Sequence, residues 1–354
     1  MPGPVLEIDG SQRSGSGTIL RLSVALSAIT GRPLHMINIR AKRSNPGLRP
    51  QHLEAVLTAA RLCGARVEGA HVGSMEIRFE PGPIRGGSVR ARIGTAGSIP
   101  MLIMTVLPIC LFAQSKVRVF IERGGTDVRH APTINYMRYV FLPVLARMGV
   151  RAEIRVLRYG YYPKGMGAAE LIVEPVEELK PLVLEDFGAV KAIRGVSVCT
   201  FLEERKVADR QAKAARKVLA KEGFDADIEV VYDRSNPVQK GSSIVLWAET
   251  NTGVRVGADA IGELGKPAEV VGREAAEGLL AELRARATAD IHMADMLVPY
   301  VALAEGRSAY LARELTDHLD TNIWLAELIL GAKFNIEKMD GLYRIEKLPE
   351  GARP

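Results

Sequence analysis

The sequence has few cysteines, and none of them forms a recognisable pair. Cys63, Cys110 and Cys199 are odd in number, lie far apart and have apolar neighbours. This pattern is typical of buried free thiols in a reducing compartment and does not fit a disulfide framework. No two of them have the spacing of a zinc finger, so we expect no structural zinc ion.

Long hydrophobic runs and a secretory signal are also lacking. The most apolar segment, 99–113, is too short to cross a bilayer and contains Pro100 and Pro108. The first ten residues, MPGPVLEIDG, have no basic stretch followed by an apolar one. We therefore expect a cytoplasmic protein with no membrane partner, in which residues 99–113 form a buried helix.

The chain has no excess of acidic residues. Its 47 Lys and Arg residues outnumber 41 Asp and Glu residues, which gives a formal net charge of +6. A modest basic excess favours a polyanionic partner such as nucleic acid. The 354 residues are enough for two domains or for one domain with a large insertion.

A weak internal repeat organises the chain, each unit being a helix, a strand, a loop, a second helix and two strands. The periodicity of apolar residues and the glycines between elements define three copies. In the first copy we expect helices at 18–30 and 53–63 and strands at 34–40, 66–68 and 75–79. In the second we expect helices at 99–113 and 132–148 and strands at 117–122, 152–157 and 168–173. The third is displaced, with helices at 289–303 and 320–330 and strands near Ala309, Phe334 and Tyr343.

A segment at 184–286 interrupts the repeats and carries its own strands and two charged helices, at 203–222 and 268–286. We expect an α/β protein of α+β repeats divided into a large domain at 1–183, an inserted α/β domain at 184–286, and the rest of the large domain at 287–354. The first charged helix is rich in cations, which form either a solvated face or an RNA contact. These cations are Lys206, Arg210, Lys213, Arg216, Lys217 and Lys221.

Polar loops precede the second helix of each copy, and we expect them to meet at one site. The first loop contains Arg40, Lys42, Arg43 and Arg49 around a Pro-Gly turn, and guanidinium groups match phosphate oxygens. A glycine loop at 13–18, which opens the helix that carries Arg21, adds free backbone N–H groups for an anion. It has neither the Walker nor the dinucleotide-binding spacing.

Among the six histidines, His318 is the strongest catalytic candidate. It lies between Asp317 and Asp320, in a turn rich in Thr and Asn that precedes a helix. A neighbouring carboxylate or carbonyl there could fix the tautomer of a nucleophilic imidazole. His52 follows the cationic loop on the first turn of a helix, where a phosphate contact and a structural role are both open.

Five blocks in order give the chain a specific resemblance to RNA 3'-terminal phosphate cyclases over nearly its whole length. The blocks are IRAKRSNPGLRPQHL at 39–53, TAGS at 95–98, GGTD at 124–127, GYYPKG at 160–165 and HLDTN at 318–322. The resemblance implies three repeats of two helices on a four-stranded sheet, with a smaller domain inserted before the last repeat. This agrees with the repeats deduced from the residues.

The resemblance also implies a ligase (nucleotidyltransferase) that uses ATP, with a divalent Mg or Mn ion, to convert an RNA 3'-phosphate into a 2',3'-cyclic phosphate. The reaction would pass through a histidinyl-AMP enzyme and an RNA-adenylate. His318 matches the nucleophile that accepts AMP. The matching phosphate-binding residues are Arg21, Arg40, Arg43, Gln51 and His52, and the adenine pocket would contain Pro132, His292 and the bordering Asp295.

The chain departs from the family pattern at several positions. Ser14 stands where the glycine loop of the family carries a Glu near the metal, so the resemblance assigns no metal ligand here. His292 replaces a Tyr that stacks on adenine, Met296 replaces a Gln, and Met166 interrupts a run of glycines.

Two other functions remain open. A non-catalytic cyclase-like protein that binds RNA in ribosome assembly would explain the loss of the Glu at position 14, whereas the retained His318 argues against it. A relative of the enolpyruvyl transferases would explain an anion-binding cleft but not the HLDTN block. The natural RNA and the oligomeric state are not determined by the sequence.

Overall fold

The computed structural model describes residues 3–350 and shows a mixed α/β fold with four four-stranded sheets. The first repeat comprises β1 (Leu6–Asp9), α1 (Gly17–Thr30), β2 (Leu34–Ile37), α2 (Pro50–Cys63), β3 (Arg66–Glu68) and β4 (Ile77–Glu80). Its strands lie in the order β1-β2-β4-β3. The β1–β2 pair is parallel and the other two pairs are antiparallel.

The second repeat has the same order of elements. It comprises β5 (Gly87–Arg92), α3 (Ile99–Leu111), β6 (Val117–Gly124), a helical segment, β7 (Arg151–Arg158) and β8 (Gly167–Glu174). The helical segment consists of α4 (Ile134–Tyr136), a π-helical turn (Met137–Phe141) and α5 (Leu142–Ala146). The strand order β5-β6-β8-β7, with one parallel pair, reproduces that of the first sheet.

The third repeat is divided by the insertion. Its first strand, β9 (Val183–Leu184), precedes the inserted segment, and the rest follows it: α8 (Met293–Met296), α9 (Val298–Leu303), β14 (Ser308–Ala312), α10 (Asp317–Leu330), β15 (Phe334–Met339) and β16 (Leu342–Lys347). The order β15-β16-β14-β9 again has a single parallel pair, β14–β9. The predicted fold of three repeats and an insertion is therefore confirmed.

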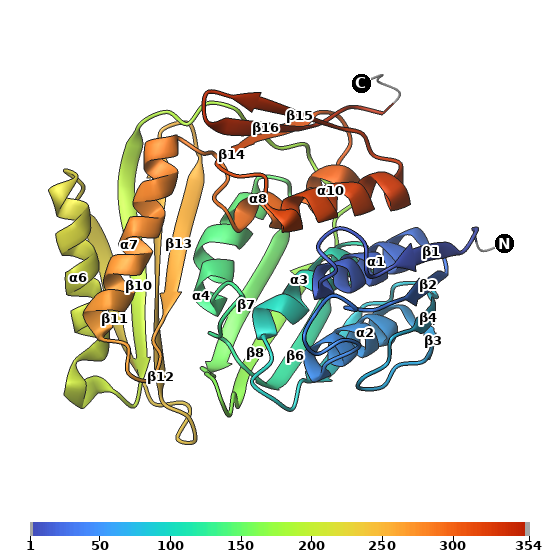
Figure 1. Cartoon of the computed structure of the whole chain (residues 1–354), viewed down its shortest axis with the longest axis horizontal. Helices are drawn as coiled ribbons and strands as arrows, with labels where there is room; N and C mark the ends of the chain where they lie inside the picture. Colours follow the sequence, from blue (N-terminus) through green and yellow to red (C-terminus); the bar gives the residue numbers. More distant parts are fainter. Residues whose placement is uncertain (1–2, 351–354) are drawn as a thin grey trace.

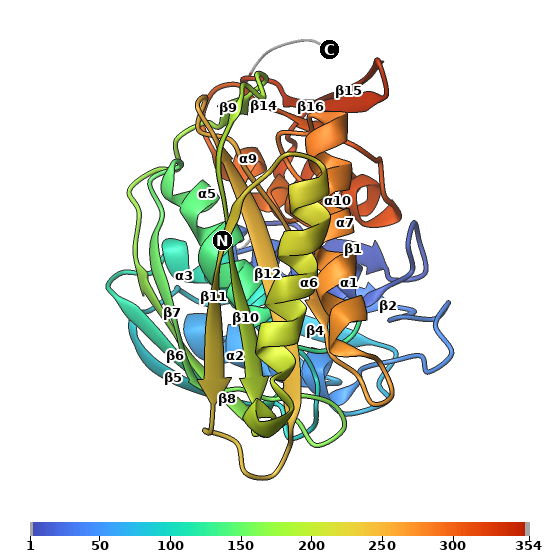
Figure 2. The same cartoon turned by 90° about the vertical axis from the view of Figure 1, so that its left-hand side faces the viewer.

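The inserted segment forms a four-stranded sheet of its own with two long helices. It comprises β10 (Val190–Thr200), a 3₁₀ turn (Glu203–Arg205), α6 (Val207–Lys221), β11 (Ala226–Asp233), β12 (Gly241–Thr250), β13 (Arg255–Ile261) and α7 (Ala268–Ala285). The helices cover one face of this sheet, and Trp247 on the other face stacks on Tyr139 of the π-helical turn, with ring centroids 5.3 Å apart. Figure 2 shows the insert from its own side.

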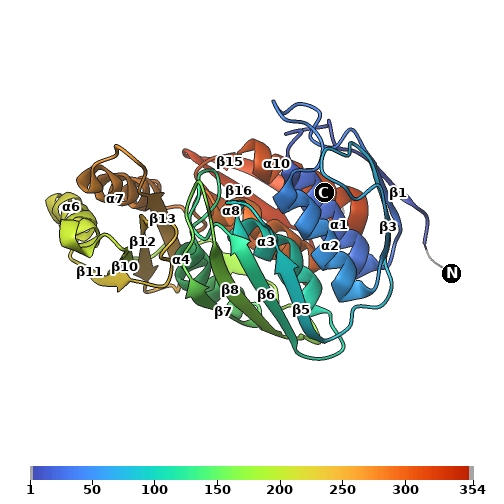
Figure 3. The same cartoon turned by 90° about the horizontal axis from the view of Figure 1, so that it is seen from below.

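The helices of the three repeats lie together in the interior, and the sheets lie outside them (Figures 1 and 3). Helix α3 shows why: its sequence IPMLIMTVLPICL is apolar on every side, and eleven of its thirteen residues are buried. A helix with this pattern is stable only when neighbours surround it. No helix among residues 3–350 is long and apolar enough to cross a membrane.

Several predicted elements differ from the observed ones. Strands β1 and β5 were not predicted, because β1 has only four residues and β5, at a sheet edge, is mostly polar. The strand predicted at 34–40 ends at Ile37, since Asn38 and Arg40 adopt φ values of 52° and 54°, which no strand tolerates. The single helix predicted at 289–303 is divided into α8 and α9.

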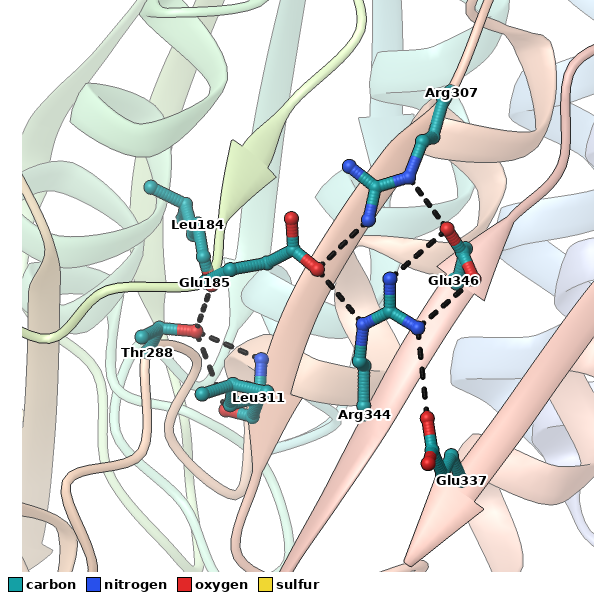
Figure 4. Close-up of polar contacts among 8 residues, drawn as sticks. All are labelled: Leu184, Glu185, Thr288, Arg307, Leu311, Glu337, Arg344 and Glu346. Carbon is teal, nitrogen blue, oxygen red and sulfur yellow. Dashed lines mark hydrogen bonds and ion pairs between the residues drawn. The ribbon is translucent and has the colours of Figure 1, made fainter. Parts of the chain in front are cut away.

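The insertion leaves the third sheet and returns to it at the same point. The hydroxyl of Thr288, on the returning chain, donates to the carbonyl of Leu184 at 2.6 Å and accepts from the backbone N–H of Leu311 at 2.8 Å (Figure 4). Both ends of the insert are therefore held against β14.

Candidate active site

The candidate nucleophile His318 lies on the first turn of α10, so the prediction that it precedes the helix was wrong. Thr316 caps the helix by accepting a hydrogen bond from the backbone N–H of Leu319 at 3.1 Å. Asp317 and Asp320 in the first turn favour this start because carboxylates interact well with the positive end of the helix dipole.

The glycine loop and α1 lie directly against the start of α10. The backbone N–H of Ser14 donates to the Thr321 hydroxyl at 3.2 Å, and Arg13 forms an ion pair with Asp320 at 3.0 Å. These contacts join positions that are about 300 residues apart in the sequence. The first and third repeats therefore build this part of the site together.

One ring nitrogen of His318 has a defined partner. Its Nδ1 lies 3.2 Å from the Thr18 hydroxyl oxygen, which also accepts a hydrogen bond from Arg21 at 3.3 Å. Nδ1–H can donate to that oxygen, and the lone pair of the neutral ring then resides on Nε2. In that tautomer Nε2 is the nitrogen available to attack.

The electrostatic surroundings of His318 keep it neutral. Desolvation lowers its pKa below the ordinary value, and the charges of Arg21 and Arg43 lower it further, while Asp317 opposes them. A neutral imidazole at neutral pH is the nucleophilic form.

Beside His318, a recess extends between the helices of different repeats. Its residues are Thr18, Arg21, Leu22, Met101, Met104, Phe141, Asp295, Met296, Pro299, Tyr300, His318 and Asn322. Burial lowers the pKa of Arg21 to about 10, and burial raises that of Asp295 to about 7. The Tyr300 hydroxyl and the Asn322 Oδ1 have no hydrogen-bond partner within residues 3–350. The recess thus combines apolar walls with polar groups that can receive a ligand.

The arginines of the cationic loop before α2 have two kinds of surroundings. The guanidinium of Arg40 donates to the carbonyls of Asn45 and Gly47 at 2.7 and 2.8 Å and so holds its own loop. Arg43 and Arg49 are exposed, and neither side chain has an ion pair or hydrogen bond within the described chain. Their charges are free to meet an anionic ligand.

Gln51 and His52 occupy the first turn of α2 and are less available than the arginines. The Gln51 Oε1 accepts from the backbone N–H of Ser98 at 2.8 Å, which connects the first repeat to the second. His52 is 5% exposed, and burial lowers its pKa to about 2. A Cβ atom at Gly17 would lie 2.3 Å from its Nε2, so only glycine fits there. His52 is therefore a neutral, tightly packed side chain.

His292 borders a second groove, which lies between the second repeat and the insert, and Pro132 directly follows Ala131 of its lining. The Nε2 of His292 is 3.7 Å from Asp259 on β13, whose other oxygen accepts from the N–H of Thr133 at 2.6 Å. Burial acts to lower the pKa of His292, but the nearby carboxylates, Asp259 foremost, outweigh it and raise the pKa. The groove is formed by Val128, Arg129, His130, Ala131, Asp259, Ala260, Ile261, Lys266, Glu274 and His292.

Sequence reasoning missed Asp259 and Tyr300, both of which line these two spaces. Asp259 comes from the insert, and Tyr300 is an apolar-face residue of α9 that is 1% exposed. No local pattern distinguishes either from ordinary strand and core residues, because their neighbours in the site are remote in sequence.

Comparison with known proteins matches the family described as RNA 3'-terminal phosphate cyclase over residues 12–336. The chain belongs to the RNA 3'-terminal phosphate cyclase family. It is 49% identical over 341 residues to the RNA 3'-terminal phosphate cyclase of Pyrobaculum aerophilum, covering 96% of this chain and 97% of that protein. For the protein of the same name from Methanopyrus kandleri, the identity is 44% over 352 residues, with 98% and 99% covered. The Pyrococcus furiosus protein is 46% identical over 330 residues, with 93% and 94% covered.

In this member of the cyclase family, four of the predicted residues line two neighbouring spaces, and Arg40, Arg43, Gln51 and His52 line neither. Arg21, Asp295 and His318 line the recess, whereas His292 lines the second groove, with Pro132 close by. Helix α8 stands between the two, since it begins after His292 and contains Asp295.

The same chain offers no ready cage for a metal ion. Residues 3–350 contain no group of three or more His, Cys, Asp or Glu side chains that could hold one. Ser14, at the position of the family Glu, has its hydroxyl 3.0 Å from that of Ser16. The residues present therefore do not fit a metal bound by the protein alone.

Proposed function

We propose that this chain is an ATP-dependent RNA 3'-phosphate cyclase that carries AMP on His318. The observation that supports this most is the surroundings of His318: a neutral ring with Nδ1 at 3.2 Å from Thr18 and a pKa lowered by desolvation and by Arg21 and Arg43. We also infer a cytoplasmic location from the three buried free cysteines.

In the first step, the Nε2 lone pair of His318 attacks the α-phosphorus of ATP. The N–P bond forms as the bond to the bridging oxygen breaks, and pyrophosphate leaves with the electron pair. Arg21 and Arg43 both act on the ring electrostatically, and their charges would stabilise the phosphoryl oxygens in the transition state. The apolar wall of the recess would exclude water from the adduct.

In the second step, an oxygen of the RNA 3'-phosphate attacks the phosphorus of the adduct, and the N–P bond breaks to regenerate His318. The ribose 2'-hydroxyl then attacks the RNA phosphorus, loses its proton and expels AMP. The balance is one RNA 3'-phosphate and one ATP converted into a 2',3'-cyclic phosphate, AMP and pyrophosphate.

A divalent ion would enter with the phosphates of ATP as part of the substrate. Because residues 3–350 supply no cluster of metal ligands, the cationic side chains would take a larger share of charge neutralisation here. In the proposed reaction, Mg or Mn is therefore an ion bound to the phosphates of ATP.

Incubation of the protein with α-labelled ATP and a metal salt, followed by a denaturing gel, tests the assignment. We expect an acid-labile adduct in wild type and in His71→Ala, since His71 is an exposed residue in a surface turn, and no adduct in His318→Ala. An adduct that persists in His318→Ala would refute the nucleophile. Conversion of a 3'-phosphate RNA into a phosphatase-resistant end tests the whole reaction.

The second candidate, a non-catalytic RNA-binding relative, is favoured by one observation, the serine at position 14. It predicts that wild type forms no adduct at any metal concentration and nevertheless binds RNA. The same labelling experiment therefore separates the two functions.

A further inference from the structure

Three loops of the second repeat pack on one another, and one of them contacts the first turn of α2. Gly97 contacts Gln51, because a Cβ atom at Gly97 would lie 2.8 Å from the Gln51 Cβ. The N–H of Gly125 donates to the carbonyl of Gly97 at 2.8 Å. A Cβ atom at Gly165 would lie 2.8 Å from the Cα of Ala96. The β7–β8 loop is thus connected to the active site by direct packing.

The β7–β8 loop presents an aromatic ring to solvent. Tyr162 is 78% exposed, the largest exposed fraction of any aromatic residue in the described chain. Lys164 beside it is exposed, and so is Arg123 at the end of β6. The side chains of Arg123 and Lys164 have no hydrogen-bond or ion-pair partner within residues 3–350. We call Arg123, Tyr162 and Lys164 the hairpin-loop patch.

The β7–β8 loop, which carries Tyr162 and Lys164, is held in place by contacts with the insert. Asn236, from the β11–β12 loop of the insert, donates to the carbonyls of Tyr159 and Gly165 at 2.8 and 3.0 Å. The Tyr161 ring is buried and packs against Gly241, where a Cβ atom would lie 2.1 Å from the ring. A ring held outward by a fixed backbone can stack on a ligand with little loss of entropy.

We propose that the hairpin-loop patch binds the single-stranded RNA several nucleotides upstream of the 3'-phosphate, with a base stacked on Tyr162. Single-stranded nucleic acid is bound by cations along the backbone and by aromatic rings under the bases. The patch supplies both, and the β7–β8 loop packs on Ala96, next to Gly97, which contacts Gln51 at the start of α2. This inference rests on the proposed function, since it assumes that the 3'-phosphate lies beside His318.

The insert provides the competing surface, because α6 also carries exposed cations. Arg210 is already paired with Glu269 at 2.7 Å, and Arg216 donates to the carbonyl of Ile228 at 2.6 Å. Lys213, Lys217 and Lys221 remain exposed, and Tyr232 on β11, which is 47% exposed, donates its hydroxyl to Asp209 of α6. The patch is favoured because Tyr162 is the more exposed ring, at 78%, and because its loop packs on Ala96, next to Gly97 and Gln51, whereas the hydroxyl of Tyr232 already has a partner on α6.

Fluorescence anisotropy with a labelled ten-nucleotide RNA that ends in a 3'-phosphate tests the proposal directly. We expect Tyr162→Ala to weaken binding about tenfold, the scale of one lost base–aromatic stack, and Tyr162→Phe to bind like wild type. The double variant Arg123→Gln, Lys164→Gln should weaken binding and reduce the slope of log Kd against log salt by about 1.4, at about 0.7 per phosphate contact. A dinucleotide with a 3'-phosphate, too short to reach the patch, should bind all four proteins alike.

Lys213→Ala, Lys217→Ala is the matched control and should bind the ten-nucleotide RNA like wild type. Wild-type affinity in Tyr162→Ala and in the double variant would overturn the proposal, as would a loss of binding in the α6 control. Thermal unfolding shows whether each variant is folded. If Tyr162→Ala does not fold, the binding of the Arg123→Gln, Lys164→Gln double variant tests the proposal instead. Labelling of wild type with AMP needs no RNA, so a failure there would refute the proposed function and leave the binding result valid.

Discussion

Two groups of arginines in this molecule have opposite surroundings. On the third sheet, Arg307 forms ion pairs with Glu185 at 2.7 Å and Glu346 at 2.5 Å, and Arg344 contacts the same two carboxylates at 2.7 and 3.1 Å (Figure 4). At the candidate site, Arg21, Arg43 and Arg49 have no ion pair with a carboxylate within the described chain.

The pKa shifts express the same difference. The hydrogen bonds that Arg307 donates to Glu185 and Glu346 raise its pKa, whereas burial lowers the pKa of Arg21 to about 10. Among the site arginines only Arg21 is desolvated, with Asp295 partly offsetting its charge, whereas Arg43 and Arg49 are exposed. A desolvated cation without an ion pair costs stability, which a ligand with negative charge would recover. We infer that the third-sheet arginines stabilise the structure and that the site arginines are available to bind phosphate groups.

The largest effect is expected from His318, at the centre of the unpaired group. His318→Ala should abolish AMP labelling, because it removes the proposed nucleophile. Its free energy of unfolding in urea should stay within about 0.5 kcal/mol of wild type, as for other exposed substitutions. A large loss of stability would mean that His318 is a structural residue.

Removal of one site arginine should cost activity and little stability. Arg43→Ala should lower the kcat/KM of cyclisation roughly 30-fold, which corresponds to about 2 kcal/mol for a lost charge-assisted contact. Arg43→Lys should recover only part of this, since an ammonium lacks the planar fork. Arg151→Ala, another exposed arginine without a charged partner, is the control. Equal rates in Arg43→Ala and Arg151→Ala would show that the loop is merely solvated.

Removal of a third-sheet arginine should do the reverse. Arg344→Ala should lower the free energy of unfolding by about 1–2 kcal/mol, the value of a partly screened ion pair. The reason is that Glu346 is buried and would retain Arg307 as its one arginine partner among these two. AMP labelling should be unchanged. A loss of labelling at full stability would remove the distinction between the two groups.

A smaller effect concerns the pH dependence of labelling. Protonated His318 cannot attack, so the rate falls as pH drops through its pKa, which desolvation, Arg21, Arg43 and His292 hold down against Asp317. Arg43→Ala removes one of these positive charges, raises the pKa and moves the acidic limb to higher pH. The ratio of labelling rates at pH 6 and pH 8 should therefore be lower than in wild type, and Lys213→Ala should leave it unaltered.

The smallest effect is expected when a carboxylate, like those beside the third-sheet arginines, is introduced into the site. Ser14→Glu should lower the metal concentration for half-maximal labelling by about threefold, because an anionic ligand is added near the phosphates. If instead wild type forms no adduct at any metal concentration and Ser14→Glu restores it, the natural protein is a non-catalytic relative.

The repeats could be predicted from the sequence because their helices have strong periodicity and clear ends. Helix α1 begins and ends within a residue of the prediction, with Ser16 as its cap and Gly31 in the left-handed region. Strand β5 could not be predicted, since an edge strand with one buried residue has no apolar alternation to detect.

The sequence by itself determined which residue types are available: a histidine between two aspartates, a cationic loop and the five family blocks. Only the tertiary structure decided which of them meet. It places the Thr18 hydroxyl 3.2 Å from His318 Nδ1 and lets Arg40 donate a hydrogen bond within its own loop. It also keeps His52 neutral, with a pKa of about 2. These outcomes depend on burial and on contacts between repeats, and neither is encoded in the local pattern of residues.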